Sequence, residues 1–304
     1  MPSALRNLSR ALFSNAYFLL TVTTLSWGGN AVASRLAVGE ISPLALTTGR
    51  WAGVVILILL FARGPLIADW PELRRRLPFV LLLGALGFTV FNALMYTAAH
   101  STTAINIGII QGSIPVFVLI GAFVAYSTPV SWVQAIGVAT TVVGVALIAF
   151  QGDVARLTSL TLNLGDLLII GAGILYAGYT VALRRRPPVS GIAMFAVMAF
   201  AALVTSLPLV AIEILMGDFL WPSPKGLAVL SFVVLLPSFV AQIFFLRSVD
   251  LIGPGRAGVF VNLVPIFASG LSVLILGEQF QVFHGAALAL VLGGIWLAER
   301  GKKA

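Results

Sequence analysis

The sequence predicts an all-α integral membrane protein with ten transmembrane helices in two inverted five-helix repeats. Of its 304 residues, 60% are hydrophobic and only 9% are charged, whereas about a quarter of the residues of soluble domains are charged. Ten apolar runs with short connections follow one another, each near the ~20 residues that a bilayer requires. An apolar run that carries polar residues, glycines and a proline recurs weakly in the second half, which is typical of transporters built from internal repeats.

The ten expected spans divide evenly between the two halves of the chain. We expect the first repeat within residues 1–152 and the second within residues 153–304. The first run resembles a signal peptide, since Arg6 and Arg10 precede it, but we retain it as a span because it matches the sixth run. The expected spans are 14–36, 43–62, 77–99, 102–126, 130–150, 164–183, 191–216, 226–247, 254–276 and 280–299.

Two pairs of stretches carry the internal similarity. Ser101–Phe117 aligns with Leu251–Phe267, and Trp27–Arg35 aligns with Tyr176–Arg184. Because each half contains five spans, an odd number, the second half enters the membrane in the opposite orientation. We interpret the shared glycines and prolines as helix-packing points or hinges rather than as substrate contacts. These residues are Gly108, Pro115, Gly258 and Pro265.

The basic residues predict the orientation of the chain. Positively charged residues gather in cytoplasmic loops, so we expect both termini in the cytoplasm of a bacterial-type inner membrane, with the lipid bilayer as a partner. The net charge of +8 does not predict a nucleic-acid partner, because the basic residues lie between apolar runs rather than on one face. Inside would be Arg6, Arg10, Arg63, Arg74, Arg75, Arg76, Arg184, Arg185, Arg186, Arg247, Arg256, Arg300, Lys302 and Lys303; outside would be Arg35, Arg156 and Lys225, and Arg50 lies within the second span.

The sequence offers no evident site for a metal or a cofactor. It contains no cysteine, which excludes disulfides and thiolate chemistry, and His100 and His284 lack the spacing of metal ligands on a helix. Without a carboxylate pair or an activated nucleophile at membrane depth, an intramembrane enzyme is disfavoured. A purely structural scaffold would not explain polar residues at matching depths. The oligomeric state stays open, and a monomer would suffice.

Several short motifs occur together in an order that resembles a known family. They are Leu25-Ser-Trp-Gly28, Gly165-Asp166, Tyr176-Ala177, Leu276-Gly-Glu278 and Gly293-Gly294, with Pro115 and Pro265 between them. In these motifs the chain resembles the EamA-type branch of the drug/metabolite transporter superfamily, and within it the YddG-type exporters of aromatic and other neutral amino acids. The resemblance implies a transporter and not an enzyme. The chain departs from the pattern at Tyr126-Ser-Thr-Pro129, where the Leu-Gly-Glu turn is not repeated, and it lacks the first-span glutamate of the four-span multidrug pumps.

Polar and aromatic side chains mark a candidate substrate site. On a helix, residues three or four apart share a face, and spans in both halves carry such stripes at corresponding depths. Amides and phenols can bond the carboxylate and the ammonium of a small zwitterion without a buried fixed charge. We predict that the substrate is bound by Trp27, Asn30, Asn92, Tyr96, Gln111, Tyr176, Tyr179, Gln242 and Asn262.

Alternative roles stay open for several polar residues. Gln111 and Asn262 are equally compatible with hydrogen bonds between helices. Tyr96 lies near the outer boundary, where the sequence is equally compatible with a membrane-interface aromatic and with a residue at the mouth of a cavity. We interpret three further charged residues as gating or structural groups: Glu278, Arg247 and Arg256.

Together these features predict an exporter of small neutral or aromatic amino acids that works by alternating access. Inverted repeats readily supply the two states that such a mechanism needs. A carrier of other small molecules, such as nucleosides, sugars or cationic drugs, is the main alternative. The sequence does not distinguish a coupled from an uncoupled carrier, and it leaves the direction of net flux open.

Overall fold

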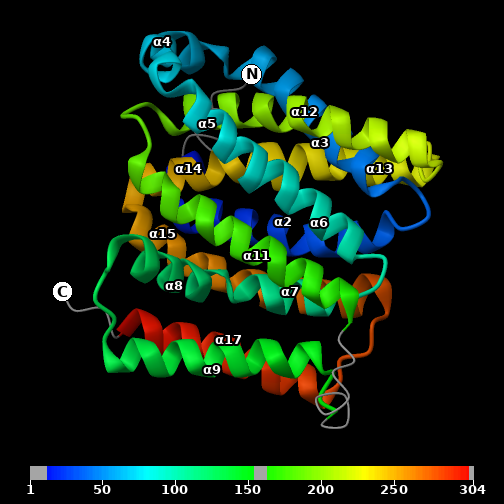
Figure 1. Cartoon of the computed structure of the whole chain (residues 1–304), viewed down its shortest axis with the longest axis vertical. Helices are drawn as coiled ribbons and strands as arrows, with labels where there is room; N and C mark the ends of the chain where they lie inside the picture. Colours follow the sequence, from blue (N-terminus) through cyan, green and yellow to red (C-terminus); the bar gives the residue numbers. More distant parts are fainter. Residues whose placement is uncertain (1–11, 154–162, 301–304) are drawn as a thin grey trace.

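The computed structural model describes residues 12–153 and 163–300, and in this part of the chain the regular elements are all helices. The helices run roughly side by side, with their connections gathered at the two ends of the bundle (Figure 1). Nine helices in the described ranges are long and apolar enough to cross a membrane. The chain is therefore a multi-pass membrane protein, as predicted.

In the first half, the long helices begin and end within a few residues of the predicted boundaries. One short helix, α4, was not predicted and occupies the connection after the second span. The elements are α2 (Ala16–Leu36), α3 (Pro43–Phe61), α4 (Arg63–Leu73), the 3₁₀ turn η1 (Arg74–Arg76), α5 (Leu77–Gly84), the π-helical segment η2 (Ala85–Val90), α6 (Phe91–Ala98), α7 (Ala104–Gly112), α8 (Ile114–Tyr126) and α9 (Trp132–Ala149).

In the second half, the eighth and ninth predicted spans are each divided into several helical segments. The elements are α11 (Leu164–Ala182), the 3₁₀ turn η3 (Leu183–Arg185), α12 (Gly191–Met216), α13 (Pro224–Val233), the π-helical segment η4 (Val234–Val240), α14 (Ala241–Ile252), α15 (Pro254–Phe260), the 3₁₀ segment η5 (Val261–Leu263), α16 (Val264–Leu271), the π-helical segment η6 (Ser272–Leu276) and α17 (Val282–Arg300).

The two ends of the bundle are distinguished by the connections that they carry. End A carries the α2–α3, α6–α7 and α12–α13 connections, at the right of Figure 1, and end B carries the α8–α9 and α14–α15 connections, at the left. At the lower edge of the same view, α9 and α17 form a pair of their own. Of the remaining helices, α14 and α16 pack against α2, α6 and α8 pack against α11, and α3 packs against α12.

The helix α2 is long enough to span a bilayer but is not one of the nine apolar helices. Its polar residues Thr23, Thr24, Asn30 and Ser34 are all 7% exposed or less, so they face protein rather than lipid. Thr23 Oγ1, for instance, reaches the carbonyls of Leu19 at 2.9 Å and of Ala241 in α14 at 3.2 Å. A helix enclosed by other helices can carry such groups because its neighbours satisfy them.

Equivalent irregularities occur in the third and eighth predicted spans. The π-helical segment η2 ends just before Phe91-Asn92, and η4 ends just before Ala241-Gln242. Asn92 and Gln242 are 150 positions apart (242 − 92), the same offset that relates Ser101–Phe117 to Leu251–Phe267. Because π-helical segments re-aim the side chains that follow them and are frequent at functional sites, both positions are candidates for a functional role.

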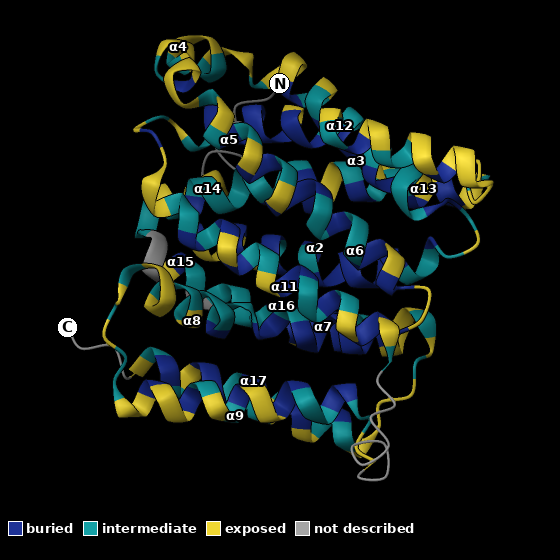
Figure 2. Cartoon of the chain, viewed as in Figure 1, coloured by how far each residue is buried: buried dark blue, intermediate teal, exposed yellow. Residues whose placement is uncertain are grey.

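Two clusters of buried apolar residues fill the bundle, one toward each end. On α3, Leu46 belongs to the cluster near end A, and Val54 belongs to the cluster near end B. Large apolar side chains also cover much of the outer surface, including Leu60, Val124 and Leu215, which are 67%, 75% and 85% exposed (Figure 2). Such a surface is suited to contact with lipid chains.

Candidate substrate-binding site

A cluster of buried polar side chains joins neighbouring helices near the middle of the bundle. Arg50 of α3 donates from Nη1 to Asn92 Oδ1 at 2.6 Å and to Tyr96 Oη at 2.7 Å, both on α6. Tyr96 Oη donates in turn to Asn30 Oδ1 of α2 at 3.4 Å. These four residues are each 7% exposed or less. Together with Gln111 of α7 they form what we call the polar cluster.

Met95 connects Gln111 to the rest of the polar cluster. The amide nitrogens of Asn30 and Gln111 approach its sulfur at 3.5 and 3.1 Å. A thioether is a weak acceptor, so both amides remain available to a stronger one. Met95 itself is fully buried.

Three members of the polar cluster lie at similar depths within the bundle. Arg50 is seven residues from the first residue of α3, and Asn30 and Asn92 are each six residues from the last residues of α2 and α6. At a rise of 1.5 Å per residue, these three positions are roughly 9–10.5 Å from end A, and Tyr96 lies one turn nearer to it. Arg50 also falls between Leu46 and Val54, at the boundary of the two apolar clusters.

Arg50 adds a charge to the polar cluster, whereas the predicted site contains only uncharged residues. In the sequence it stood out only as a charge within the second span, and it was not assigned to the site. The signal was nevertheless present, because an ionisable residue in the middle of an apolar run indicates a functional position by default. Its neighbours support a functional role, since Trp51 lies under the guanidinium at 5.2 Å and stacks on Phe88 at 4.8 Å.

Tyr176 and Tyr179 of α11 belong to an aromatic group beside the polar cluster. Their ring centroids are 5.2 Å apart, and Tyr176 lies 5.0 Å from Phe91 while Tyr179 lies 5.8 Å from Phe88. Gly87 makes this approach possible, since a Cβ there would lie 2.6 Å from the ring of Tyr179. The aromatic side chains of α11 therefore meet α6 at the π-helical segment that precedes Asn92.

The other predicted site residues lie on the side formed by α2 and the second half. Trp27 Nε1 donates to the carbonyl of Pro237 at 3.0 Å, and its ring lies 5.4 Å from that of Phe245. Gln242 is half-buried on α14, and the buried Oδ1 of Asn262 has no hydrogen-bond partner among the described residues. Trp27 and Tyr176 pack on different neighbours. That both of them contact one substrate therefore stays a prediction.

The predicted hinge residues differ between the two halves. Pro115 and Pro265 are equivalent, since each is the second residue of a new helix after a break in its span. Gly108 packs directly on Ala268, so a side chain would clash there, as expected of a packing point. A Cβ at Gly258, in contrast, meets no described atom within 4 Å, and the role of Gly258 as a packing point or hinge stays a prediction.

Comparison with known proteins identifies the family. The model of the EamA-like transporter family matches residues 14–150 and, a second time, residues 163–299. The chain belongs to the EamA-like transporter family. The two matches cover most of the described chain and agree with a fold made of two repeats.

Individual relatives of this EamA protein extend the comparison over nearly its whole length. The uncharacterized transporters YyaM and YetK of Bacillus subtilis (strain 168) are 25% and 27% identical, over 94% and 95% of this chain and 93% and 88% of theirs. A probable terminal-alkyne amino-acid exporter of Streptantibioticus cattleyicolor is 24% identical over 94% of each chain. A solved crystal structure, 20% identical, matches 93% of this chain and 96% of its own with a TM-score of 0.61, which supports the fold alone. The family and these named relatives are transporters and not enzymes.

At end A of the EamA fold, acidic residues cap helix N-termini. Glu278 accepts from the backbone N–H groups of Ala104 and Ile105, at 2.9 and 3.1 Å, and lies 3.9 Å from Arg35. Carboxylates are favoured at this position, where free N–H groups and the helix dipole are both positive. The contact joins the two halves, because Glu278 follows η6 and Arg35 ends α2.

Two further carboxylates hold neighbouring elements together at end A, and one of them, Glu213, also caps a helix. Glu213 of α12 accepts from Ser42 Oγ at 2.6 Å and from the N–H groups of Leu44 and Ala45 at 3.1 and 3.2 Å, at the start of α3. Glu40 accepts from the Ser223 hydroxyl and pairs with Lys225 at 3.2 Å. The hydroxyl and the ammonium hold the pKa of Glu40 below its usual value.

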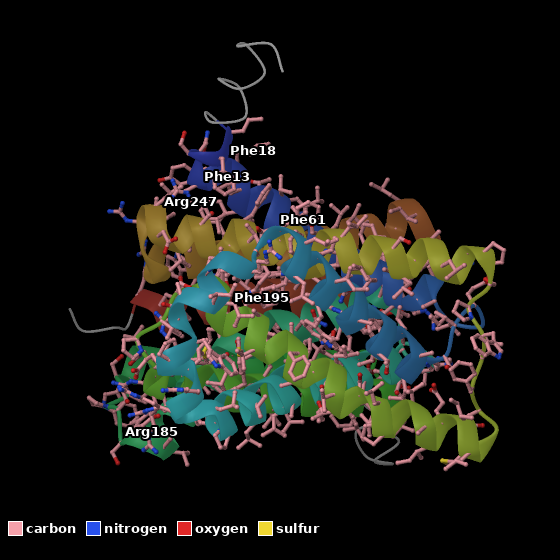
Figure 3. All side chains as sticks on the ribbon, turned by 90° about the horizontal axis from the view of Figure 1, so that it is seen from above. Phe13, Phe18, Phe61, Arg185, Phe195 and Arg247 are labelled. Carbon is pink, nitrogen blue, oxygen red and sulfur yellow. The ribbon has the colours of Figure 1, made fainter. Side chains whose placement is uncertain are left out.

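End B carries basic residues in contact with aromatic rings. Arg247 lies over Phe13 at 5.6 Å, and Figure 3 shows the two side chains together, with Arg185 at the same end of the bundle. Arg184 lies over Tyr126 at 4.7 Å. Within the described residues Arg247 forms no ion pair, and Arg256 is exposed. The gating or structural role of both arginines stays a prediction.

A small depression between α8, α9 and α17 lies away from the polar cluster. Its lining includes Pro115, Gln134, Ile295 and Glu299. None of these residues, apart from the hinge proline, belongs to the predicted site. The depression therefore has no part in the candidate substrate-binding site.

Proposed function

We propose that this protein exports small neutral amino acids across a bacterial inner membrane by alternating access. The observation that carries the proposal is the polar cluster, in which Asn30, Arg50, Asn92 and Tyr96 are buried together at membrane depth in a transporter fold. Polar side chains at this depth are expensive and mark substrate pathways. Membership of the EamA-like family supplies the transport function.

Two considerations favour amino acids over other solutes. The relative in Streptantibioticus cattleyicolor is named a probable amino-acid exporter, and amides, phenols and a guanidinium offer both donors and acceptors to a zwitterion. The positive charge of Arg50 disfavours cationic drugs, because like charges at low dielectric repel strongly. Nucleosides and sugars remain the competing substrate classes.

The proposed topology has ten spans, with α2 as the first and with repeats in residues 1–152 and 153–304. The length of α2 and its enclosure by other helices support this count. We place end B and both termini in the cytoplasm, since Arg184, Arg185 and Arg247 lie at that end. Reporter fusions after Arg76, after Arg186 and at Ala304 should report the cytoplasm, whereas fusions at Asp153 and Asp218 should report the outside. Reporters at 153 and 186 on one side would contradict the inverted repeat.

Transport by purified protein in liposomes tests the function directly. We expect saturable uptake of neutral amino acids from a panel that also contains a nucleoside and a sugar, assayed with and without a pH gradient. Uptake of the nucleoside or the sugar, with no uptake of any amino acid, would contradict the proposal. Dependence on the pH gradient would show whether the carrier is coupled to protons.

Four variants test which residues form the site. Trp27→Ala and Tyr176→Ala should weaken transport of bulky side chains more than of small ones, because aromatic walls offer apolar area. Asn30→Ala and Gln242→Ala should weaken all amino acids about tenfold, since an unpaired polar group in the cavity costs ~1–3 kcal/mol. Gln281→Ala, which removes an exposed amide, is the control. If all four variants fold and transport like the parent, the site lies elsewhere.

A further inference from the structure

Arg50 is a buried cation whose hydrogen bonds go to uncharged groups. Its Nη1 is shared between Asn92 Oδ1 and Tyr96 Oη, and its Nε is buried without any partner among the described residues. No carboxylate in residues 12–153 and 163–300 lies within 4.0 Å of it as an ion pair. A buried charge without a counter-charge is strongly destabilising unless something else compensates it.

The nearby buried acids are committed elsewhere. Glu213 caps the start of α3 through Ser42 and two backbone N–H groups. Asp166, which is fully buried, accepts from Thr102 Oγ1 and from Asn106 Nδ2. Both carboxylates have fixed partners near end A, so neither buried acid of the described residues pairs with Arg50.

The hydrogen bonds of the polar cluster run in one direction and leave donors in excess. Arg50 donates to Tyr96, and Tyr96 donates to Asn30. The amides of Asn30 and Gln111 then end on the weakly accepting sulfur of Met95. A site with unused donors, one of them on a guanidinium, is complementary to an anion rather than to a cation.

We propose that Arg50 is the anchor for the carboxylate of the transported solute. This inference rests on the proposed function, because it assigns one group of an amino acid to one side chain. Asn92 and Tyr96 fix the guanidinium through Nη1, which leaves the edge formed by Nε and Nη2 for a bidentate pair with a carboxylate. The amides of Asn30 and Gln111 would add donors on the same side of α6.

Ligand-induced thermal stabilisation of the purified protein tests this assignment. Three ligands with the same ring separate the groups: phenylalanine, phenylalaninamide without the carboxylate, and 3-phenylpropionate without the ammonium. We expect the unmodified protein to bind phenylalanine about 100-fold more tightly than phenylalaninamide. A ratio of affinities of this size is usual for the loss of one charge-assisted hydrogen-bonded pair. In Arg50→Gln the preference should fall below about threefold, and Arg50→Lys, which keeps the charge but not the fork, should lose about tenfold.

The controls keep this inference separate from the proposed function. Arg63→Gln, at an exposed arginine, should keep the full preference. Phenylalaninamide that binds the unmodified protein as well as phenylalanine would overturn the inference, and so would an unchanged preference in Arg50→Gln or no stabilisation by any of the three ligands at millimolar concentration. In the first two cases amino-acid transport can still occur and the proposed function stands. Conversely, Arg50-dependent binding of 3-phenylpropionate without amino-acid transport would support the anchor and refute the proposed substrate.

Discussion

The turn at Leu276–Glu278 and the turn at Tyr126–Thr128 share a backbone conformation but differ in chemistry. Gly277 and Ser127, which are 150 positions apart, both end their helices in the left-handed region, with φ of 66° and 51°. The next residue is Glu278 at end A and Thr128 at end B. Glu278 caps α7 and approaches Arg35, whereas at end B Arg184 lies over the ring of Tyr126.

This difference shows that two symmetric ends can be held with unequal strength. A carboxylate on two backbone donors contributes about 1.5–3 kcal/mol per charged hydrogen bond. A cation–π contact at a partly exposed position contributes about 0.5–1 kcal/mol. End A is therefore held by the stronger contacts, and under the proposed alternating access we expect Glu278 to release α7 when end A opens.

A second pair of equivalent positions, Gly108 and Gly258, sharpens the comparison and gives the largest expected effect. Gly108→Leu should reduce transport at least about tenfold, because a side chain would push α7 away from Ala268 of α16 and overpacking costs about 1–3 kcal/mol. Gly258→Leu, with open space around its Cβ position, should stay within about twofold of the parent. Uptake rates of the two variants, at equal amounts of folded protein, test this. Equal losses would mean that Gly258 packs closely in another state of the transport cycle.

Removing the charge of Glu278, which caps α7, should give the next largest effect. Glu278→Gln keeps the size of the side chain but loses the charge, so the open form of end A should rise about five- to thirtyfold, equivalent to about 1–2 kcal/mol. Because the chain has no cysteine, Ala37→Cys provides a single reporter, at a position 4% exposed at end A. Its labelling by a membrane-impermeant maleimide should accelerate accordingly. Glu72→Gln, in an exposed ion pair with Arg75, is the control, and equal labelling rates in both variants would contradict the proposed closure.

The helices were predictable from the sequence because each span must be long and apolar enough to cross the bilayer. The predicted spans 43–62, 164–183 and 191–216 correspond to helices Pro43–Phe61, Leu164–Ala182 and Gly191–Met216. The π-helical segments were not predicted. They adjust the register of one helix against its neighbours, as at Gly87 beside Tyr179, and this depends on packing rather than on the local sequence.

The candidate site was predictable only in part. Helical spacing predicted Asn30, Asn92 and Tyr96 as site residues, and these three lie together. The expected depth of Tyr96 in the membrane could not show whether its ring lies at the membrane interface or inside the bundle. Tyr96 is 2% exposed and bonded to Arg50, so the membrane-interface alternative is wrong. Arg50 was missed because its charge was considered only in relation to topology.

A charge added to the weaker turn gives the smallest expected effect and tests the comparison from the other side. Thr128→Glu places a carboxylate at the position equivalent to Glu278, two residues after Tyr126, whose ring lies under Arg184. It should favour closure of end B. The gain should stay below about 1 kcal/mol, since Thr128 is only half-buried and partly exposed ion pairs are weak.

A cysteine reporter at Val181 tests this prediction. Val181 is 7% exposed, and its carbonyl accepts from Tyr126 Oη. In inverted vesicles the reporter should be labelled about two- to fourfold more slowly. Thr128→Gln, of equal size without charge, should leave the rate unchanged, and a second Arg184→Gln substitution should cancel the slowing by Thr128→Glu. If Thr128→Gln slowed labelling equally, the size of the side chain rather than its charge would be the cause. The carboxylate present in one turn and absent from the other would then not explain why the two ends are held unequally.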